Sequence, residues 1–182
     1  YGGGDEAKIE EVILRFAQRA FRGPVQAEEI TRYVQLVESQ LANGRSRPEA
    51  LRAGYTAMIA SPRFYYLQES QGRLNSYEIA SRLSYFLWSS MPDEILFRLA
   101  AADRLTDPSV VSEQVDRMLD DPKAAAFVRR FTQRWLRLDK LGAMPPEKAK
   151  FGIYWHRRLE SQILAQTDAF FADLVKTNGP IR

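Results

Sequence analysis

The sequence predicts an all-α protein, an irregular bundle of seven to eight helices that forms one body or two small packed helical modules. Apolar residues recur at intervals of three and four along almost the whole chain, which is the period of an amphipathic helix. Sustained two-residue alternation, the signature of a strand, is missing. Acidic residues followed by proline at 107–108 and 121–122 repeat one helix-starting device.

Residues 1–70 are predicted to form an N-terminal module of about three helices. The first helix carries its apolar face between Ile9 and Phe21, and the third begins at the cap Ser46 with Pro48 in its first turn. Glycine tolerates the left-handed conformation that ends a helix, and proline cannot continue one. The expected helix ends are Gly23-Pro24, Asn43-Gly44 and Ser61-Pro62.

Residues 74–182 are predicted to form a second module, truncated at its C-terminus. Its first helix begins at Asn75, whose side chain can form a capping box with Glu78, and runs to about Trp88. Three further starts follow at Asp93, Asp107-Pro108 and Asp121-Pro122.

The last part of this module is expected to begin with a linker. Residues 141–152 contain Gly and Pro at several positions and break the helical pattern. One long helix is predicted from Tyr154 to Lys176, with a stop at Asn178-Gly179-Pro180.

Composition excludes several kinds of chemistry. The 182 residues include no Cys and one His, so disulfides, thiolate zinc sites, iron-sulfur clusters, covalently attached haem and multi-His metal sites are excluded. We therefore expect no cofactor and no metal in this chain. The longest apolar run, Ala124–Val128, is five residues and too short for a transmembrane segment. No catalytic motif is present, which leaves open whether the chain belongs to an enzyme.

Charge is unevenly distributed along the chain. Residues 122–158 carry ten basic and two acidic side chains, whereas residues 1–121 carry 14 basic and 18 acidic ones. Four basic residues are expected on one stripe of the helix that starts near Asp121. This candidate docking face is Lys123, Arg130, Arg134 and Arg137. It could meet an acidic partner or an anionic lipid surface, although a solvated face is the more economical interpretation; no motif supports nucleic acid.

The predicted C-terminal helix has an unusually wide apolar arc, about 200° against the 100° or so of a typical surface helix. Its candidate apolar interface is Phe170, Phe171, Leu174 and Val175. We expect this arc to be covered by residues beyond Arg182 or by another chain, or else to remain exposed.

Other polar and aromatic residues have simpler structural interpretations. His156 is the only imidazole, and its place in the first turn of a helix with no second ligand motif argues against a metal site. The pairs Asp93-Glu94 and Asp120-Asp121 fit helix caps better than catalytic carboxylates. Aromatic residues at helical spacing are more typical of a core than of a ligand groove. The set in question is Trp88, Trp135, Trp155, Tyr65, Tyr66, Tyr77 and Tyr85.

Several segments carry a family resemblance that covers most of residues 9–141. They are Phe16–Val25, Ala60–Phe64, Ser76–Asp93, Leu99–Leu105, Met118–Pro122 and Phe131–Leu136. They resemble large exported proteins of planctomycetes and related bacteria, which join a cytochrome-c-like haem domain to helical domains of unknown function. Two features depart from the pattern: the haem-attachment motif is missing, and Gln166-Thr167 replaces the Glu-Thr expected before Phe170-Phe171. The resemblance implies export and haem in other domains, and it assigns no catalytic residue.

Two functions of different classes follow. The first is a non-catalytic helical scaffold or interaction module, whose partners are other domains of the same polypeptide or partner protein subunits. The second is part of a periplasmic or surface enzyme, directed at polysaccharide, whose active site lies in other domains. Carboxylates gathered between aromatic walls would favour the enzyme, and a broad apolar or basic face would favour the scaffold.

Overall fold

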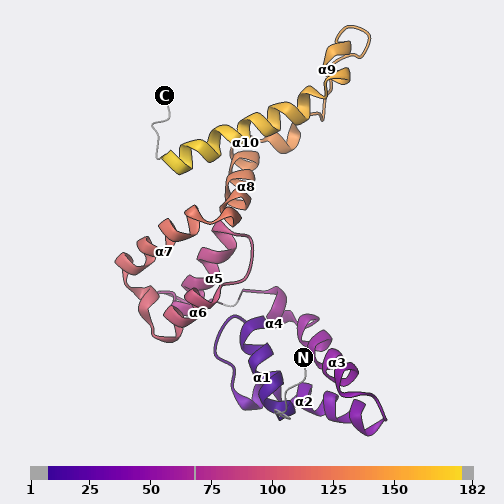
Figure 1. The fold of residues 1–182 in the computed structure, drawn as a ribbon, viewed down its shortest axis with the longest axis vertical. Coiled ribbons are helices and arrows are strands. Elements are labelled where there is room, and N and C mark those ends of the chain that lie inside the picture. Colours follow the sequence, from indigo (N-terminus) through magenta and orange to yellow (C-terminus); the bar gives the residue numbers. More distant parts are fainter. Residues whose placement is uncertain (1–7, 68, 178–182) are drawn as a thin grey trace. The chain divides into compact units, whose positions relative to one another are not determined.

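The computed structural model describes residues 8–67 and 69–177, and the predicted all-α class is confirmed over that part of the chain (Figure 1). Ten α-helices and three short 3-10 turns are present there, with no strand. Eight of these helices have seven residues or more, as the sequence predicts. The predicted stop at Asn178-Gly179-Pro180 lies outside the described residues.

The chain divides into two compact units. The first unit comprises residues 1–81 and 91–106, and the second comprises residues 82–90 and 107–182. Helix α5 (Ser76–Leu87) therefore contributes residues to both units. This division by contacts assigns residues 74–81 and 91–106 to the first unit, whereas the sequence-based modules are residues 1–70 and 74–182.

The first unit is built around α1 (Ile9–Ala20), α2 (Ala27–Ala42) and α3 (Arg47–Ile59). All three pack against one another, and the short α4 (Pro62–Tyr65), which the sequence did not indicate, follows α3. Their apolar stripes meet in one core that water does not reach. Its completely buried side chains include Ile13, Ala17, Ile30, Val37, Ala50 and Met58.

Predicted caps are present where this unit's helices begin. Ser46 and Glu49 form the reciprocal capping box of α3, and Asn75 Oδ1 accepts the Tyr77 and Glu78 amides at the start of α5. Asp93 caps α6 (Glu94–Ala101) by accepting the Leu96 amide at 2.9 Å. These polar residues thus satisfy amides that have no partner within their own helix.

The second unit contains α7 (Pro108–Asp120), α8 (Ala125–Trp135), α9 (Gly152–His156) and α10 (Leu159–Thr177). Helix α8 packs against α10, as Figure 1 shows, and α9 precedes α10. The start predicted at Asp121-Pro122 is a 3-10 turn, η2 (Pro122–Ala124), which leads into α8.

The single long helix predicted from Tyr154 to Lys176 is wrong at one point. The chain breaks between α9 and α10, where Arg158 adopts the left-handed conformation with φ 48°. Side chains satisfy the carbonyls released there: the Gln162 amide donates to Arg157 O at 2.9 Å, and the Ser161 hydroxyl donates to Arg158 O at 2.8 Å. Apolar periodicity continues across this break, so the sequence pattern could not reveal the break.

Candidate functional site

A row of aromatic rings runs from the end of α5 along α8 to α10 in the second unit. We call it the aromatic face: Phe86, Phe127, Phe131, Trp135, Phe170 and Phe171. Its centroids are 5.1 Å apart for Phe86 and Phe127, 5.6 Å for Phe127 and Phe131, and 5.5 Å for Phe131 and Trp135. The spacing of four residues places the rings of Phe127, Phe131 and Trp135 on one side of α8.

Helix α10 continues the row. The Phe171 ring lies 5.6 Å from Trp135 in an edge-on arrangement, and Phe170 lies 6.0 Å from Phe171. Of the two phenylalanines, Phe171 is half-buried against α8, whereas Phe170 points outward and is 56% exposed. Leu174 and Val175, which complete the predicted apolar interface, are also only half-buried.

Much of the aromatic face lies in water. Phe86 is 62% exposed, Trp135 54% and Phe131 41%, and neither α9 nor α10 contains a single buried residue. Large contiguous apolar patches are rare on monomers and mark interaction surfaces. The interpretation of the aromatic residues as core is right for buried Trp88 and wrong for the exposed residues Trp135, Trp155, Tyr65 and Tyr66, the last two being 69% exposed.

An open groove of about 460 Å³ follows the α5 and α8 part of this face. Four rings of the aromatic face line it together with Tyr85, and the guanidinium groups of Arg130 and Arg134 form its polar edge. No carboxylate lines it. Its surface is thus apolar with a cationic edge, suited to an apolar partner that carries acidic side chains.

The structure brings together two of the four residues of the predicted docking face. Arg130 and Arg134 are exposed one turn apart on α8. Lys123 precedes that helix, in η2, where its ammonium group lies 4.5 Å from the centre of the Trp88 ring. Arg137 follows it in the left-handed conformation, with φ 53°. The expected stripe is therefore interrupted at both ends of α8.

A polar contact that the sequence did not reveal joins α8 to α10. The hydroxyl of buried Thr132 lies 3.0 Å from an Asp168 carboxylate oxygen and 2.8 Å from the Val128 carbonyl. Arg129 approaches the same carboxylate at 3.8 Å. Buried polar groups need such partners, so this contact fixes how the two halves of the aromatic face meet.

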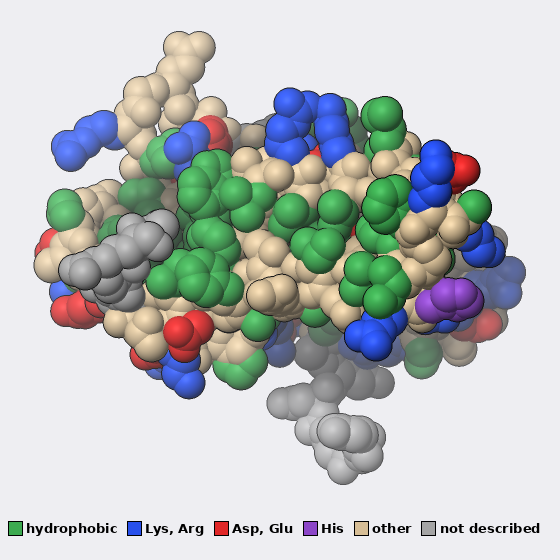
Figure 2. Space-filling view, turned by 90° about the horizontal axis from the view of Figure 1, so that it is seen from above, with side chains coloured by type: hydrophobic (Ala, Val, Ile, Leu, Met, Phe, Trp, Pro, Cys, Tyr) green, Lys and Arg blue, Asp and Glu red, His purple; other side chains and the backbone are tan. Residues whose placement is uncertain are grey.

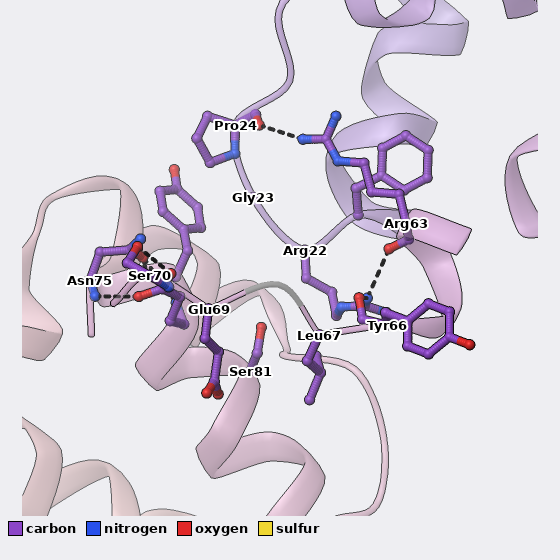
Figure 3. Close-up of a pocket in the computed structure, with 13 residues that line it drawn as sticks. Arg22, Gly23, Pro24, Arg63, Tyr66, Leu67, Glu69, Ser70, Asn75 and Ser81 are labelled. Carbon is purple, nitrogen blue, oxygen red and sulfur yellow. Dashed lines mark hydrogen bonds between the residues drawn. The ribbon is translucent and has the colours of Figure 1, made fainter. Parts of the chain in front are cut away.

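A second hollow, of about 380 Å³, lies in the first unit beside the loop that leads into α5 (Figure 3). Buried Arg22 donates to the carbonyls of Phe64 at 2.9 Å, Arg63 at 3.2 Å and Tyr66 at 3.3 Å, at the end of α4. Arg63 in turn donates to Pro24 O at 3.5 Å. These bonds hold backbone segments together, and Arg22 is a structural residue that the sequence analysis missed.

The carboxylate of Glu78 at this hollow is also engaged structurally. One oxygen accepts the Ser70 amide and hydroxyl, each at 2.7 Å, and the other accepts the Asn75 amide at 2.7 Å. Burial raises the pKa of Glu78, but these hydrogen bonds outweigh it and leave the pKa below its usual value. An ionised carboxylate with committed oxygens is a poor proton donor, so the hollow does not resemble an acid-base site.

The remaining candidate residues are spread apart. His156 is exposed at the end of α9, and no group of three His, Cys, Asp or Glu side chains that could hold a metal occurs in residues 8–67 and 69–177. Asp93 and Asp121 are caps, as expected. Among the helices of the described part, none is both long and apolar enough to cross a bilayer.

Comparison with known proteins places the chain in a family. Residues 74–182, more than half of the chain, match the PSD4 family, described as a protein of unknown function (DUF1592), and the chain belongs to this family. Residues 8–69 match a second family, PSD5, also described as a protein of unknown function (DUF1595). No curated protein and no solved structure matches the chain.

Proposed function

We propose that this chain is a non-catalytic helical interaction module that presents the aromatic face to another domain or subunit. The observation that carries the proposal is the exposure of Phe86, Trp135 and Phe170 in one continuous row of ring contacts. Aromatic and Arg side chains are the residues most enriched where protein interfaces concentrate their binding energy. Arg130 and Arg134 beside the groove supply the cationic part of such a surface.

We further propose that the larger protein is exported and carries haem in another domain. Support comes from the resemblance of residues 76–93 and their neighbours to exported planctomycete-type proteins, and from the tandem occurrence of the two family matches. In that setting the module would act as a scaffold that positions an electron-transfer domain. The enzyme alternative lacks its expected signature at the groove, whose lining has aromatic walls but no carboxylate.

Hydroxyl-radical footprinting tests the docking role directly, because aromatic side chains react when water reaches them. The isolated chain and the full parent protein are labelled side by side, with exposed Tyr65 of the first unit as internal reference. We expect labelling of Phe86, Trp135 and Phe170 to fall in the parent protein while that of Tyr65 changes less. Equal labelling of the three residues in both proteins would contradict the proposal.

Charge reversal provides a second test on the same surface. The variant Arg130→Glu/Arg134→Glu should slow association of the chain with the rest of the parent protein, and added salt should weaken the wild-type association. Association kinetics over a range of salt concentrations measure both effects. If neither the variant nor salt changes association, the two arginines form an ordinary solvated helix face.

A further inference from the structure

A second exposed surface, separate from the aromatic face, lies at the start of α10. It comprises residues 138–158, from the 3-10 turn η3 (Leu138–Lys140) through α9, and we call it the basic tip. Four apolar side chains of the basic tip lie in water: Met144 is 94% exposed, Ile153 59%, Phe151 54% and Trp155 40%. No residue of α9 is buried, so these side chains do not serve a core of the second unit.

Cations surround these apolar side chains. The basic tip carries five basic residues and two acidic ones. Lys150 pairs with Glu147 at 2.8 Å, whereas Lys140, Lys148, Arg157 and Arg158 are exposed and form no ion pair with the described residues. Figure 2, seen from the side on which α9 and α10 lie in Figure 1, shows hydrophobic and basic side chains interspersed on this face.

Specific contacts hold the basic tip in shape. The Trp155 indole donates to Pro146 O at 3.1 Å, which ties α9 to the preceding loop. At its base, Tyr154 donates to Glu160 at 3.3 Å, and the Glu160 carboxylate fills the space beside Gly142, whose φ of 87° suits glycine. The exposed apolar residues therefore belong to a defined loop and helix.

We propose that the basic tip binds the surface of an anionic phospholipid bilayer. Lys140, Lys148, Arg157 and Arg158 would meet the lipid phosphates, while Met144, Phe151 and Ile153 enter the headgroup region. Tryptophan is enriched at the membrane–water interface, which suits the large, partly exposed ring of Trp155.

The form of the surface favours lipid over a protein partner. Protein interfaces are enriched in aromatic and Arg side chains but depleted in Lys, whereas the basic tip carries three lysines, and none of its residues lines the groove described above. The tip instead offers single apolar side chains along a short loop beside unpaired cations. This proposal rests on residues 138–158 alone and does not depend on the protein-docking role of the aromatic face.

Vesicle co-sedimentation of the 182-residue chain tests the proposal. The probes are vesicles of phosphatidylcholine alone and of equal parts phosphatidylcholine and phosphatidylglycerol, each at about 0.1 M and about 1 M salt. We expect binding to the anionic vesicles at the lower salt, a marked loss at the higher salt, and little binding to phosphatidylcholine. Absence of binding to anionic vesicles at about 0.1 M salt would overturn the proposal.

Charge variants then locate the contact. Lys148→Glu/Arg157→Glu should weaken partition onto anionic vesicles by at least about 30-fold, because each basic residue near such a surface contributes a factor of about five. The matched control is Arg15→Glu/Arg104→Glu, which removes the same charge from exposed positions of the first unit and should bind almost as the wild type. Equal loss in both variants would show a general charge effect and would refute the assignment to the tip.

An apolar variant tests insertion. Met144→Gln/Ile153→Gln changes two exposed side chains, so helicity by circular dichroism should remain that of the wild type. We expect weaker partition with an unchanged dependence on salt, and vesicles should shift the Trp155 fluorescence to shorter wavelength, a shift that Trp155→Phe removes. Wild-type partition of the apolar variant, or no Trp155-dependent shift, would contradict insertion.

Discussion

The α1–α3 bundle and the α8–α10 end of the chain start from similar amphipathic sequences and bury them very differently. In the bundle, Ile13, Ile30 and Met58 are completely buried in a shared core. In α9 and α10 no residue is buried, and Phe170 is 56% exposed. Helical periodicity thus predicts where an apolar face lies, but not whether this chain covers it.

The difference follows from the number of neighbours each helix has. Helices α1, α2 and α3 each pack against the other two, so each apolar stripe meets two partners. Helix α10 has α8 as its main neighbour and only limited contacts with α7 and α9. An arc of about 200° is wider than one neighbour can cover, so part of the apolar surface of α10 stays exposed.

The strongest test of this difference in burial is to shorten an isoleucine side chain in each region and compare the two losses of stability. Ile30→Ala removes a completely buried side chain and should lower the free energy of unfolding by about 2–5 kcal/mol. Ile163→Ala truncates a side chain that is 41% exposed on α10 and should cost less than about 1 kcal/mol. Urea unfolding followed by circular dichroism measures both.

Comparable losses for the two isoleucine variants would show that α10 is as tightly integrated as the bundle, contrary to the comparison above.

The next largest loss of stability is expected at a close contact between helices in the bundle. Gly54 of α3 packs against α2, and a Cβ atom there would lie 2.7 Å from Val37 Cγ2 and 3.1 Å from Ile13 Cδ1. Gly54→Ala should therefore destabilise the chain by about 1–3 kcal/mol, although alanine favours a helix. Thermal unfolding shows whether Gly54→Ala lowers or raises the stability. A rise in the melting temperature would mean that the bundle is less tightly packed than its burial indicates.

Helix caps should behave alike in the two regions, because capping is local. Ser46→Ala removes the side chain of the capping box that begins α3, and Asp121→Ala removes one that accepts the Lys123 amide at 2.8 Å in the turn leading into α8. Each should cost about 1 kcal/mol in denaturant unfolding. A cost at one cap alone would place the difference between the regions in their local sequence instead of their tertiary packing.

Acid should produce the smallest effect, in the first unit. Hydrogen bonds from the Ser46 side chain and backbone lower the pKa of Glu49 below its usual 4.5. A lowered pKa in the folded state means that this group stabilises the fold above about pH 4.5 and loses its contribution as the pH falls further. Unfolding at pH values on either side of 4.5 measures the loss, and Glu49→Gln should reduce it. An unchanged pH dependence in that variant would show that Glu49 does not cause the loss of stability in acid.

Local chemistry made most helix boundaries predictable. The Ser46, Asn75, Asp93 and Asp107 caps act within three residues of themselves, so sequence spacing reveals them. The aromatic face could not be predicted in the same way, because Phe86 and Phe127 meet at 5.1 Å although 41 positions separate them. The Thr132 and Asp168 contact is likewise tertiary.

Two further features were not predicted, one of them local and the other tertiary. The break at Arg158 depends on side-chain bonds from Ser161 and Gln162 that satisfy backbone carbonyls, and a helical pattern does not encode them visibly. The wide arc of α10 was predictable, whereas the outward position of Phe170 and the inward position of Phe171 depend on where α8 packs.

Amide hydrogen exchange on the isolated 182-residue chain tests the central claim, that the α1–α3 bundle buries a stable core whereas α9 and α10 leave their apolar side chains exposed. Exchange protection reports local opening, which is easiest where few apolar side chains are buried. We predict that amides in α2 and α3 exchange far more slowly than those in α9 and α10 at a concentration where the chain is monomeric. Equal protection of α10 and α2 under those conditions would contradict the claim.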